Sequence, residues 1–146
     1  MQRGLLLFAH GARDPRWALP FEAVEARVRQ LGTDLQPLPL VRLSFLEFMS
    51  PSLVEAGMAL AEAGCQQVDV VPLFLGAGGH VRKDLPALLG QLQAAHPTVI
   101  WRLNPAVGES PTVVEAMAAA SMATLFEPAQ PADEGSPAPA PGPCIS

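Results

Sequence analysis

The feature that most constrains the fold of this 146-residue chain is the alternation of two apolar patterns. Apolar runs of strand length recur along the chain, and each is followed by a stretch whose apolar residues have helical spacing. We expect strands at residues 4–9, 38–46, 67–75 and 98–103, and helices at residues 15–31, 51–63, 81–95 and 113–126. Strands separated by helices cannot form hairpins, so parallel pairing is expected.

The first run is apolar at every position, as in a strand that is covered on both faces. The pattern predicts a flavodoxin-like, doubly wound α/β domain, with a four-stranded parallel sheet and helices on both faces. Pro39 indicates that the second strand starts there or lies at the sheet edge. Ser50 and Pro51 predict a helix start with Ser50 as the N-cap, and Ser110 and Pro111 repeat this pattern.

Proline marks the end of the expected folded unit. Six of the 16 prolines lie within residues 127–146, a segment with no apolar periodicity and one large aliphatic residue, Ile145. Such a segment buries too little apolar surface to offset the entropy lost on ordering. We therefore expect one α/β domain over residues 1–126 and a Pro-rich disordered tail over residues 127–146.

Charge and cysteine usage exclude several classes of protein. The formal net charge is -5 and Lys83 is the one lysine, whereas proteins that bind nucleic acid or membrane surfaces normally carry a basic face. The longest early apolar run, residues 5–9, is too short for a signal-peptide core or a membrane span. Cys65 and Cys144 form no paired-cysteine motif. We expect a cytoplasmic protein that binds neither nucleic acid nor membranes.

Candidate metal ligands follow three of the predicted strands, and ligands of doubly wound sheets bind at the carboxyl ends of strands. His10 follows the first strand, Glu47 the second, and His80 the glycine-rich loop after the third. Two imidazoles and a carboxylate suit a divalent first-row metal such as Co, Fe, Ni or Zn. Taken by itself, Glu47 could equally be an ordinary solvent-exposed residue with no role as a ligand. The third histidine, His96, stands at a predicted helix end and is interpreted as structural.

Glycines and cations accompany these ligands. The glycine loop either cradles a phosphate or admits a large flat ligand, but its spacing matches neither the dinucleotide fingerprint nor the GKS/GKT loop. The glycines are Gly76, Gly78 and Gly79. Basic side chains near the strand ends could bind carboxylate groups of a ligand, because the guanidinium group of arginine pairs well with a carboxylate. Ordinary solvent-exposed surface charge explains them equally well. The cations in or near these segments are Arg13, Arg16, Arg82, Lys83 and Arg102. The apolar residues beside Glu47, which serve either the core or a flat ligand, are Phe45, Leu46, Phe48 and Met49.

Two phosphate-binding alternatives are weaker. Histidine phosphatases carry an Arg-His-Gly motif after their first strand, whereas Ala9 precedes His10 here, and Arg13 alone does not replace the missing arginine. A flavodoxin-like module that binds phosphate through the glycine loop would retain its binding when both histidines were removed.

Three segments of the chain, within about residues 3–125, are similar to a known family. They read LLLFAHGARDPR, VRLSFLEFMSPSL and VDVVPLFLGAGGHVRKDLP. In this order they resemble the short sirohydrochlorin chelatases, the single-domain CbiX/SirB type of class II chelatase. The most specific part is residues 70–86, in which a histidine follows the glycine loop.

The resemblance implies a lyase that inserts Co²⁺ or Fe²⁺ into sirohydrochlorin, on the route to cobalamin or sirohaem. It assigns metal binding to His10 and His80 and an active-site role to Glu47. The residues expected around the carboxylate-rich tetrapyrrole are Arg13, Arg82, Lys83, Gly78 and Gly79. It implies no cofactor beyond the substrate metal, and it implies a homodimer. The alternative is a non-catalytic carrier of metal or tetrapyrrole that uses the same residues.

Overall fold

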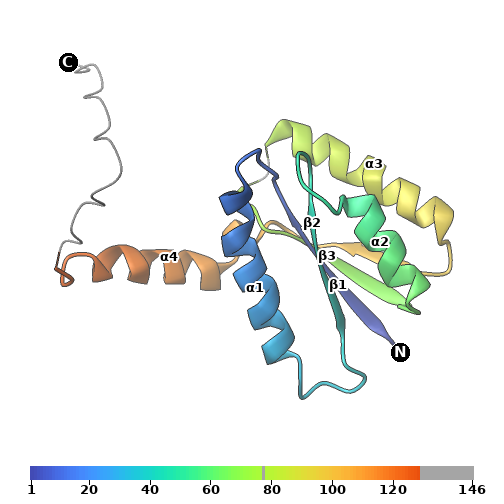
Figure 1. Ribbon diagram of the computed structural model, residues 1–146, viewed down its shortest axis with the longest axis horizontal. Coiled ribbons are helices and arrows are strands. Elements are labelled where there is room, and N and C mark those ends of the chain that lie inside the picture. Colours follow the sequence, from blue (N-terminus) through green and yellow to red (C-terminus); the bar gives the residue numbers. More distant parts are fainter. Residues whose placement is uncertain (77, 129–146) are drawn as a thin grey trace.

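The computed structural model describes residues 1–76 and 78–128 of the chain, with the side chain of His80 outside the described part. Strands and helices alternate along it as the sequence predicts (Figure 1). The elements are β1 (Arg3–Ala9), η1 (Pro15–Trp17), α1 (Ala18–Leu31), β2 (Leu40–Phe45), α2 (Leu53–Glu62), β3 (Gln67–Pro72), α3 (Gly79–Ala95), β4 (Ile100–Leu103), η2 (Val107–Glu109) and α4 (Pro111–Ala123). Most of the tail predicted for residues 127–146 lies outside the described residues.

The sheet has four strands in the order β2-β1-β3-β4, and every pairing is parallel. The central strand β1 pairs on both sides, so Leu6 lies opposite Arg42 of β2 and Val70 of β3. This confirms the predicted parallel α/β fold. It also explains Pro39, because the strand that follows it lies at the sheet edge, where a missing N–H donor is tolerated.

One face of the sheet is covered by α2 and α3 (Figure 1). Alternate residues of β1 and β3, among them Leu6, Phe8, Val68 and Val70, point to this side and are fully buried. Burial of one such aliphatic or aromatic side chain contributes about 1.5–3 kcal/mol. This face therefore holds the larger of the two apolar clusters. The cluster supports the strands whose carboxyl ends carry the predicted site.

The opposite face is covered by α1, which packs over β2 and β1. Leu7, Val41, Leu43 and Phe45 are buried there, and Phe21 of α1 contacts Phe45 edge to face with a centroid distance of 6.5 Å. The last helix, α4, forms near its predicted position but extends away from the sheet and packs mainly against η2 (Figure 1). The sheet face beside α1 is therefore less fully covered than the α2/α3 face.

The predicted start of the second helix is wrong by two residues. Helix α2 is capped by Ser52, whose hydroxyl accepts a 3.2 Å hydrogen bond from the N–H of Glu55, and not by Ser50. The cause is tertiary pairing, because the N–H of Phe45 donates to the carbonyl of Pro51 at 2.9 Å and keeps the chain extended through Ser52. In the described residues, no helix has the length and apolar character that crossing a bilayer requires.

Candidate functional site

The strand order brings the predicted ligand segments to one edge of the sheet. Glu47 follows β2, His10 follows β1, and the glycine loop that leads to His80 follows β3. Since β2, β1 and β3 are consecutive neighbours, these segments stand side by side at the carboxyl ends of the strands. We call this edge the rim, made of residues 10–13, 46–49, 75–76 and 78–83. The backbone arrangement expected for the three ligands is present.

Backbone contacts hold the first two loops of the rim together. The N–H of Leu46 donates to the carbonyl of Ala9 at 2.8 Å, which extends the β1–β2 pairing beyond the strands. A Cβ atom at Gly11 would collide with the carbonyl group of Glu47. Glycine is therefore required at residue 11 by close backbone approach, which places His10 and Glu47 on directly adjacent backbone segments.

His10 is exposed, yet it is held from two sides. Its ring lies against Phe74, with centroids 4.4 Å apart and planes tilted by 32°, and Phe74 is itself buried. Its carbonyl oxygen accepts a 2.8 Å hydrogen bond from the indole N–H of Trp17. Among the described residues, none makes a hydrogen bond to its ring nitrogens. The imidazole is thus positioned by packing while its nitrogens remain available for a metal or a proton.

Glu47 stands in a tight loop with an exposed aromatic neighbour. The N–H of Met49 donates to the Glu47 carbonyl at 2.8 Å, and Phe48 between them has a φ of 63°. A left-handed backbone is uncommon for a bulky residue and costs on the order of 1–2 kcal/mol. Phe48 is 60% exposed, and its ring lies 5.1 Å from the guanidinium carbon of Arg13. The Glu47 loop thus presents a carboxylate and an aromatic face beside a cation of the segment after β1.

The glycine loop leaves space at the start of α3. Gly78 is the N-cap of this helix, and Cβ atoms built on Gly76, Gly78 or Gly79 meet no described atom within 4 Å. Packing within the described chain does not explain these glycines. This agrees with the interpretation that they leave room for a ligand.

His80 occupies the first turn of α3 by its backbone, and the position of its side chain lies outside the described part of the structure. Among the side chains that the structure does describe, no group of three His, Cys, Asp or Glu side chains is arranged to hold a metal ion. The three-ligand set of His10, Glu47 and His80 therefore stays a prediction.

The predicted cations divide into two groups. Arg13, Arg82 and Lys83 are exposed on the rim segments, and none of them forms an ion pair with a described carboxylate. Arg82 also lines a hollow of about 240 Å³ at the ends of β3 and β4. Arg16 instead pairs with Asp14 at 2.9 Å, and the hydrogen bonds from Arg16 lower the pKa of the Asp14 carboxyl group. Rim cations are thus available at three of the five predicted positions.

Arg102 does not belong to the rim, which corrects its grouping with the strand-end cations. Its side chain lies 3.4 Å from the carboxylate of Asp69, which also receives a 3.0 Å hydrogen bond from Arg3. Burial tends to raise the pKa of Asp69, but hydrogen bonds from Arg3, Gln67 and Asn104 and the charge of Arg102 outweigh it and lower the pKa. Arg102 therefore serves the sheet, as does Asn104, which also donates to the carbonyl of Val70 at 3.2 Å.

The apolar residues beside Glu47 differ in how deeply they are buried. Phe45 is buried and Leu46 and Met49 pack against the two cores, which leaves Phe48 as the residue that can face a ligand. Sequence reasoning did not identify Phe74 as the support of the His10 ring. The two-residue alternation of the strands could have predicted this contact, because it places Phe8, His10 and Phe74 on the side covered by α2 and α3. It also missed Leu75, which is 72% exposed at the rim.

His96 takes the structural place that the sequence predicts. It forms the C-cap of α3, where its N–H donates to the carbonyl of Leu92 at 2.9 Å. Its own carbonyl accepts a 3.3 Å hydrogen bond from the indole of Trp101. The roles of His96 in the described structure are thus carried by its backbone.

The sheet order and the exposed imidazole, carboxylate and cations at its carboxyl edge define an α/β protein with a strand-end site. The family model described as CbiX matches residues 4–123. This match spans most of the chain, so the chain belongs to the CbiX family.

Known proteins with sequence similarity extend this result. A sirohydrochlorin cobaltochelatase of Saccharolobus solfataricus is 36% identical over 87 residues, which are 60% of this chain and 63% of that protein. A protein of the same name from Methanopyrus kandleri is 33% identical over 86 residues, which are 59% of this chain and 57% of that protein. The matched part of the chain spans less than two thirds of the length of these relatives.

Solved structures agree with the fold. A putative cobalamin biosynthesis CbiX protein from Marinobacter aquaeolei VT8 is 31% identical with a TM-score of 0.73, and the match covers 85% of this chain and 98% of that one. The sirohydrochlorin chelatase SirB from Bacillus subtilis subspecies spizizenii, solved in complex with cobalt, is 23% identical with a TM-score of 0.69. That match covers 84% of this chain and 51% of SirB, and it supports the shared fold.

Proposed function

We propose that the chain is a sirohydrochlorin chelatase that inserts Co²⁺ or Fe²⁺ into its tetrapyrrole substrate. The observation that carries this proposal is the close backbone approach of the His10 loop and Glu47 at the rim, beside the helix start that bears His80. Membership of the CbiX family and similarity to proteins named sirohydrochlorin cobaltochelatase support the same reaction.

The metal is a substrate in this proposal, and the rim residues hold it transiently. Neutral imidazoles of His10 and His80 would bind the divalent ion, because first-row metals favour such nitrogen ligands. A site with few protein ligands keeps coordination positions open for the pyrrole nitrogens. The support of the His10 ring by Phe74 reduces the freedom that the imidazole would lose on binding.

The proposed role of Glu47 follows from the protons that the ring must lose. Metal insertion breaks two pyrrole N–H bonds, and two protons leave the ring as the ion forms bonds to the pyrrole nitrogens. Glu47, exposed beside the His10 loop, would either accept one of these protons, with solvent taking the other, or complete the metal site, with both protons passing to solvent. A carboxylate at this place also offsets the charge of the entering ion.

The remaining rim residues suit the periphery of the substrate. Sirohydrochlorin carries many carboxylates, and Arg13, Arg82 and Lys83 are exposed cations without a described ion pair. Phe48 offers an apolar face, and the open space at Gly78 and its neighbour accommodates a flat ring. The proposal includes a homodimer and assigns this activity to one domain over residues 1–126, with residues 127–146 as a tail outside it.

The test is the rate of metal insertion by the purified full chain. Sirohydrochlorin is mixed with Co²⁺ or with Fe²⁺, with and without protein, and the absorbance change of the ring is followed. We expect the protein to accelerate insertion of at least one metal well above the rate of metal and ring alone. Binding of ring and metal without acceleration would instead identify a carrier and contradict the proposed reaction.

A further inference from the structure

Phe48 at the rim has a backbone conformation that its side chain makes costly. Its φ of 63° lies in the left-handed region, which bulky residues rarely adopt because the Cβ atom crowds the backbone there. Glycine and asparagine adopt this conformation at lower cost. Among the described residues other than glycine, Phe48 is the only one with a positive φ. An outlier of this kind at a predicted site points to a functional role for the side chain.

Burial of the Phe48 side chain does not compensate for this backbone. Phe48 is 60% exposed and belongs to neither apolar cluster of the described residues, whereas Leu46 and Met49 pack against the clusters. Phe45, three residues earlier, is buried and contacts Phe21 of α1. An aromatic residue normally stabilises a fold by burying its ring. The ring of Phe48 therefore contributes little to folding, and asparagine would suit its backbone better.

The ring of Phe48 packs with a cation of the rim. The guanidinium carbon of Arg13 lies over it, 5.1 Å from the ring centroid, which is within the range of attraction between a cation and an aromatic face. Arg13 follows β1 and Phe48 follows β2, so the pair joins two neighbouring segments of the rim. An arginine that packs on an aromatic ring still donates N–H groups to a carboxylate. The exposed part of the Phe48 ring remains open to a ligand.

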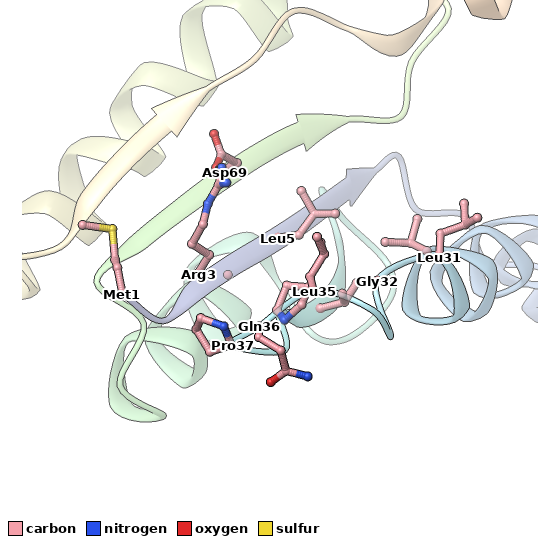
Figure 2. Close-up of a pocket in the computed structure, with 13 residues that line it drawn as sticks. Met1, Arg3, Leu5, Leu31, Gly32, Leu35, Gln36, Pro37 and Asp69 are labelled. Atoms are coloured by element: carbon pink, nitrogen blue, oxygen red, sulfur yellow. The ribbon is translucent and has the colours of Figure 1, made fainter.

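An exposed apolar residue at the other end of the strands provides a comparison. Leu35 lies at a groove of about 570 Å³ between the end of α1 and the amino ends of β1 and β3 (Figure 2). It is 58% exposed, nearly as much as Phe48, but its φ is not positive. Figure 2 also shows Arg3 reaching toward Asp69, with which it forms an ion pair at 3.0 Å. At the rim, in contrast, exposure coincides with a strained backbone and with a cation that forms no ion pair in the described residues.

We propose that Phe48 selects a planar macrocycle, because its ring stacks against the face of the bound tetrapyrrole while Arg13 binds a peripheral carboxylate. Stacked aromatic systems attract each other beyond the apolar area that they bury. A buckled macrocycle touches an aromatic face only along an edge, whereas its carboxylates still reach a cation. Phe48 therefore distinguishes planar from buckled tetrapyrroles that carry the same acid groups. The inference rests on the proposed function, since it requires that the rim bind a tetrapyrrole.

The test is the affinity of the metal-free full chain for planar and buckled rings, measured by titration calorimetry without oxygen. Sirohydrochlorin and uroporphyrin are the planar probes. Uroporphyrinogen, the reduced form of uroporphyrin, carries the same carboxylates but has saturated bridges that prevent planarity. Phe48→Asn should raise Kd for both planar rings about ten-fold, because the stacking contact is lost. It should leave Kd for uroporphyrinogen within about two-fold of the wild-type value.

Three further measurements separate stacking from a structural role. The melting temperature of Phe48→Asn should equal or exceed that of wild type, since asparagine tolerates a left-handed backbone. Phe48→Tyr should retain the wild-type affinities because it keeps the aromatic face. Leu35→Asn is the matched control, which removes a similarly exposed apolar side chain at the opposite end of the strands and should also retain them. Added to Arg13→Ala, Phe48→Asn should still weaken the binding of planar rings, because its contact with the ring is direct.

Several results would overturn the inference. They are an equal loss of affinity for planar and buckled rings in Phe48→Asn, unchanged affinity for planar rings, a lowered melting temperature, and no further loss when Phe48→Asn is added to Arg13→Ala. Metal insertion is not measured in this test. A chain that binds planar rings through Phe48 without inserting a metal would contradict the proposed reaction and support this inference. A chain that inserts metal while Phe48→Asn binds planar rings normally would overturn this inference alone.

Discussion

At the rim, Arg13, Arg82 and Lys83 are exposed and form no ion pair within the described residues, whereas around Asp69 two arginines share one carboxylate. The first group follows strand ends, and the second joins neighbouring strands. The comparison shows that charge type alone does not separate binding residues from structural ones. A charged group already bound within the protein stabilises the fold, while an unpaired one remains able to bind a ligand. Substitution of the rim cations should therefore change activity more than stability, and substitution of the charges around Asp69 should change stability more than activity.

The largest expected effect is on metal insertion at the rim. His10→Ala and His80→Ala should each lower the insertion rate by about 100-fold, equivalent to about 2.7 kcal/mol, because each removes a proposed metal ligand. The melting temperature of the His10 variant should change little, since His10 is exposed. His96→Ala is the matched control: its backbone contacts persist, so insertion should continue at nearly the wild-type rate. Near-normal insertion by either rim variant would remove that histidine from the proposed site.

Close backbone approach at the rim should produce the largest stability effect. Gly11→Ala should lower the free energy of unfolding by about 2–3 kcal/mol, because the added methyl group collides with the carbonyl of Glu47. Gly90→Ala provides a control of opposite sign, since its Cβ meets nothing within 4 Å in a helix interior and should stabilise by roughly 0.5–1 kcal/mol. Denaturant unfolding measures both. Equal stability of the two variants would contradict the role assigned to residue 11.

The Asp69 cluster should affect stability and its pH dependence without affecting insertion. Asp69→Asn should cost about 1 kcal/mol of unfolding free energy at neutral pH, because a charge-assisted hydrogen bond from Arg3 and an ion pair with Arg102 are lost. The native pKa of Asp69 is lowered, so its contribution is present above the ordinary aspartate pKa of 3.8. It is lost as the pH falls through the lower native pKa.

The difference between Asp69→Asn and wild type should therefore shrink on acidification. Thermal unfolding from pH 7 to pH 2 checks this dependence. Asp34→Asn, at an exposed carboxylate with no described ion pair, is the control and should follow the wild-type curve. A stability difference that is independent of pH would contradict the assigned role of the Asp69 charge.

The smallest effect is expected for substrate contacts at the rim. Arg13→Ala should raise KM for sirohydrochlorin by roughly three- to ten-fold with little change in kcat, because an exposed cation contributes about 1 kcal/mol to binding a carboxylate. Arg27→Ala, at an exposed arginine of α1 away from the rim, should leave KM unchanged. Steady-state kinetics at several salt concentrations measure this, and the Arg13 effect should diminish as salt increases. A loss confined to kcat would place Arg13 in the chemical step instead.

Local patterns predict the parts of this fold that depend on burial along each element. The apolar run of β1 indicates a strand covered on both faces. The alternation of buried and less buried residues in β3 indicates which of them face α2 and α3. Strand order then places His10 and Glu47 together, because both follow neighbouring strands. Features set by distant partners were not predictable in this way. Arg102 adjoins a strand end in the sequence, but its partner Asp69 lies directly opposite it on the neighbouring strand β3, which only the pairing register reveals.

The start of α2 and the direction of α4 were likewise not predictable from local sequence patterns. Ser50 and Pro51 have the composition of a helix start, yet the pairing of Phe45 with Pro51 delays the helix until after Ser52. The spacing of apolar residues predicts α4 as a helix but does not contain its direction, which η2 sets through contacts with the loop after β3. Tertiary contacts thus decide what a helical pattern alone leaves open.

The most direct test of the account is one insertion assay with Co²⁺ and sirohydrochlorin, performed in parallel on wild type, His10→Ala and Asp69→Asn. We expect fast insertion by wild type and by Asp69→Asn, and a rate close to that of metal and ring alone for His10→Ala. A wild-type rate no higher than the protein-free rate, or a loss of activity in Asp69→Asn as large as that in His10→Ala, would contradict the proposed site at the rim.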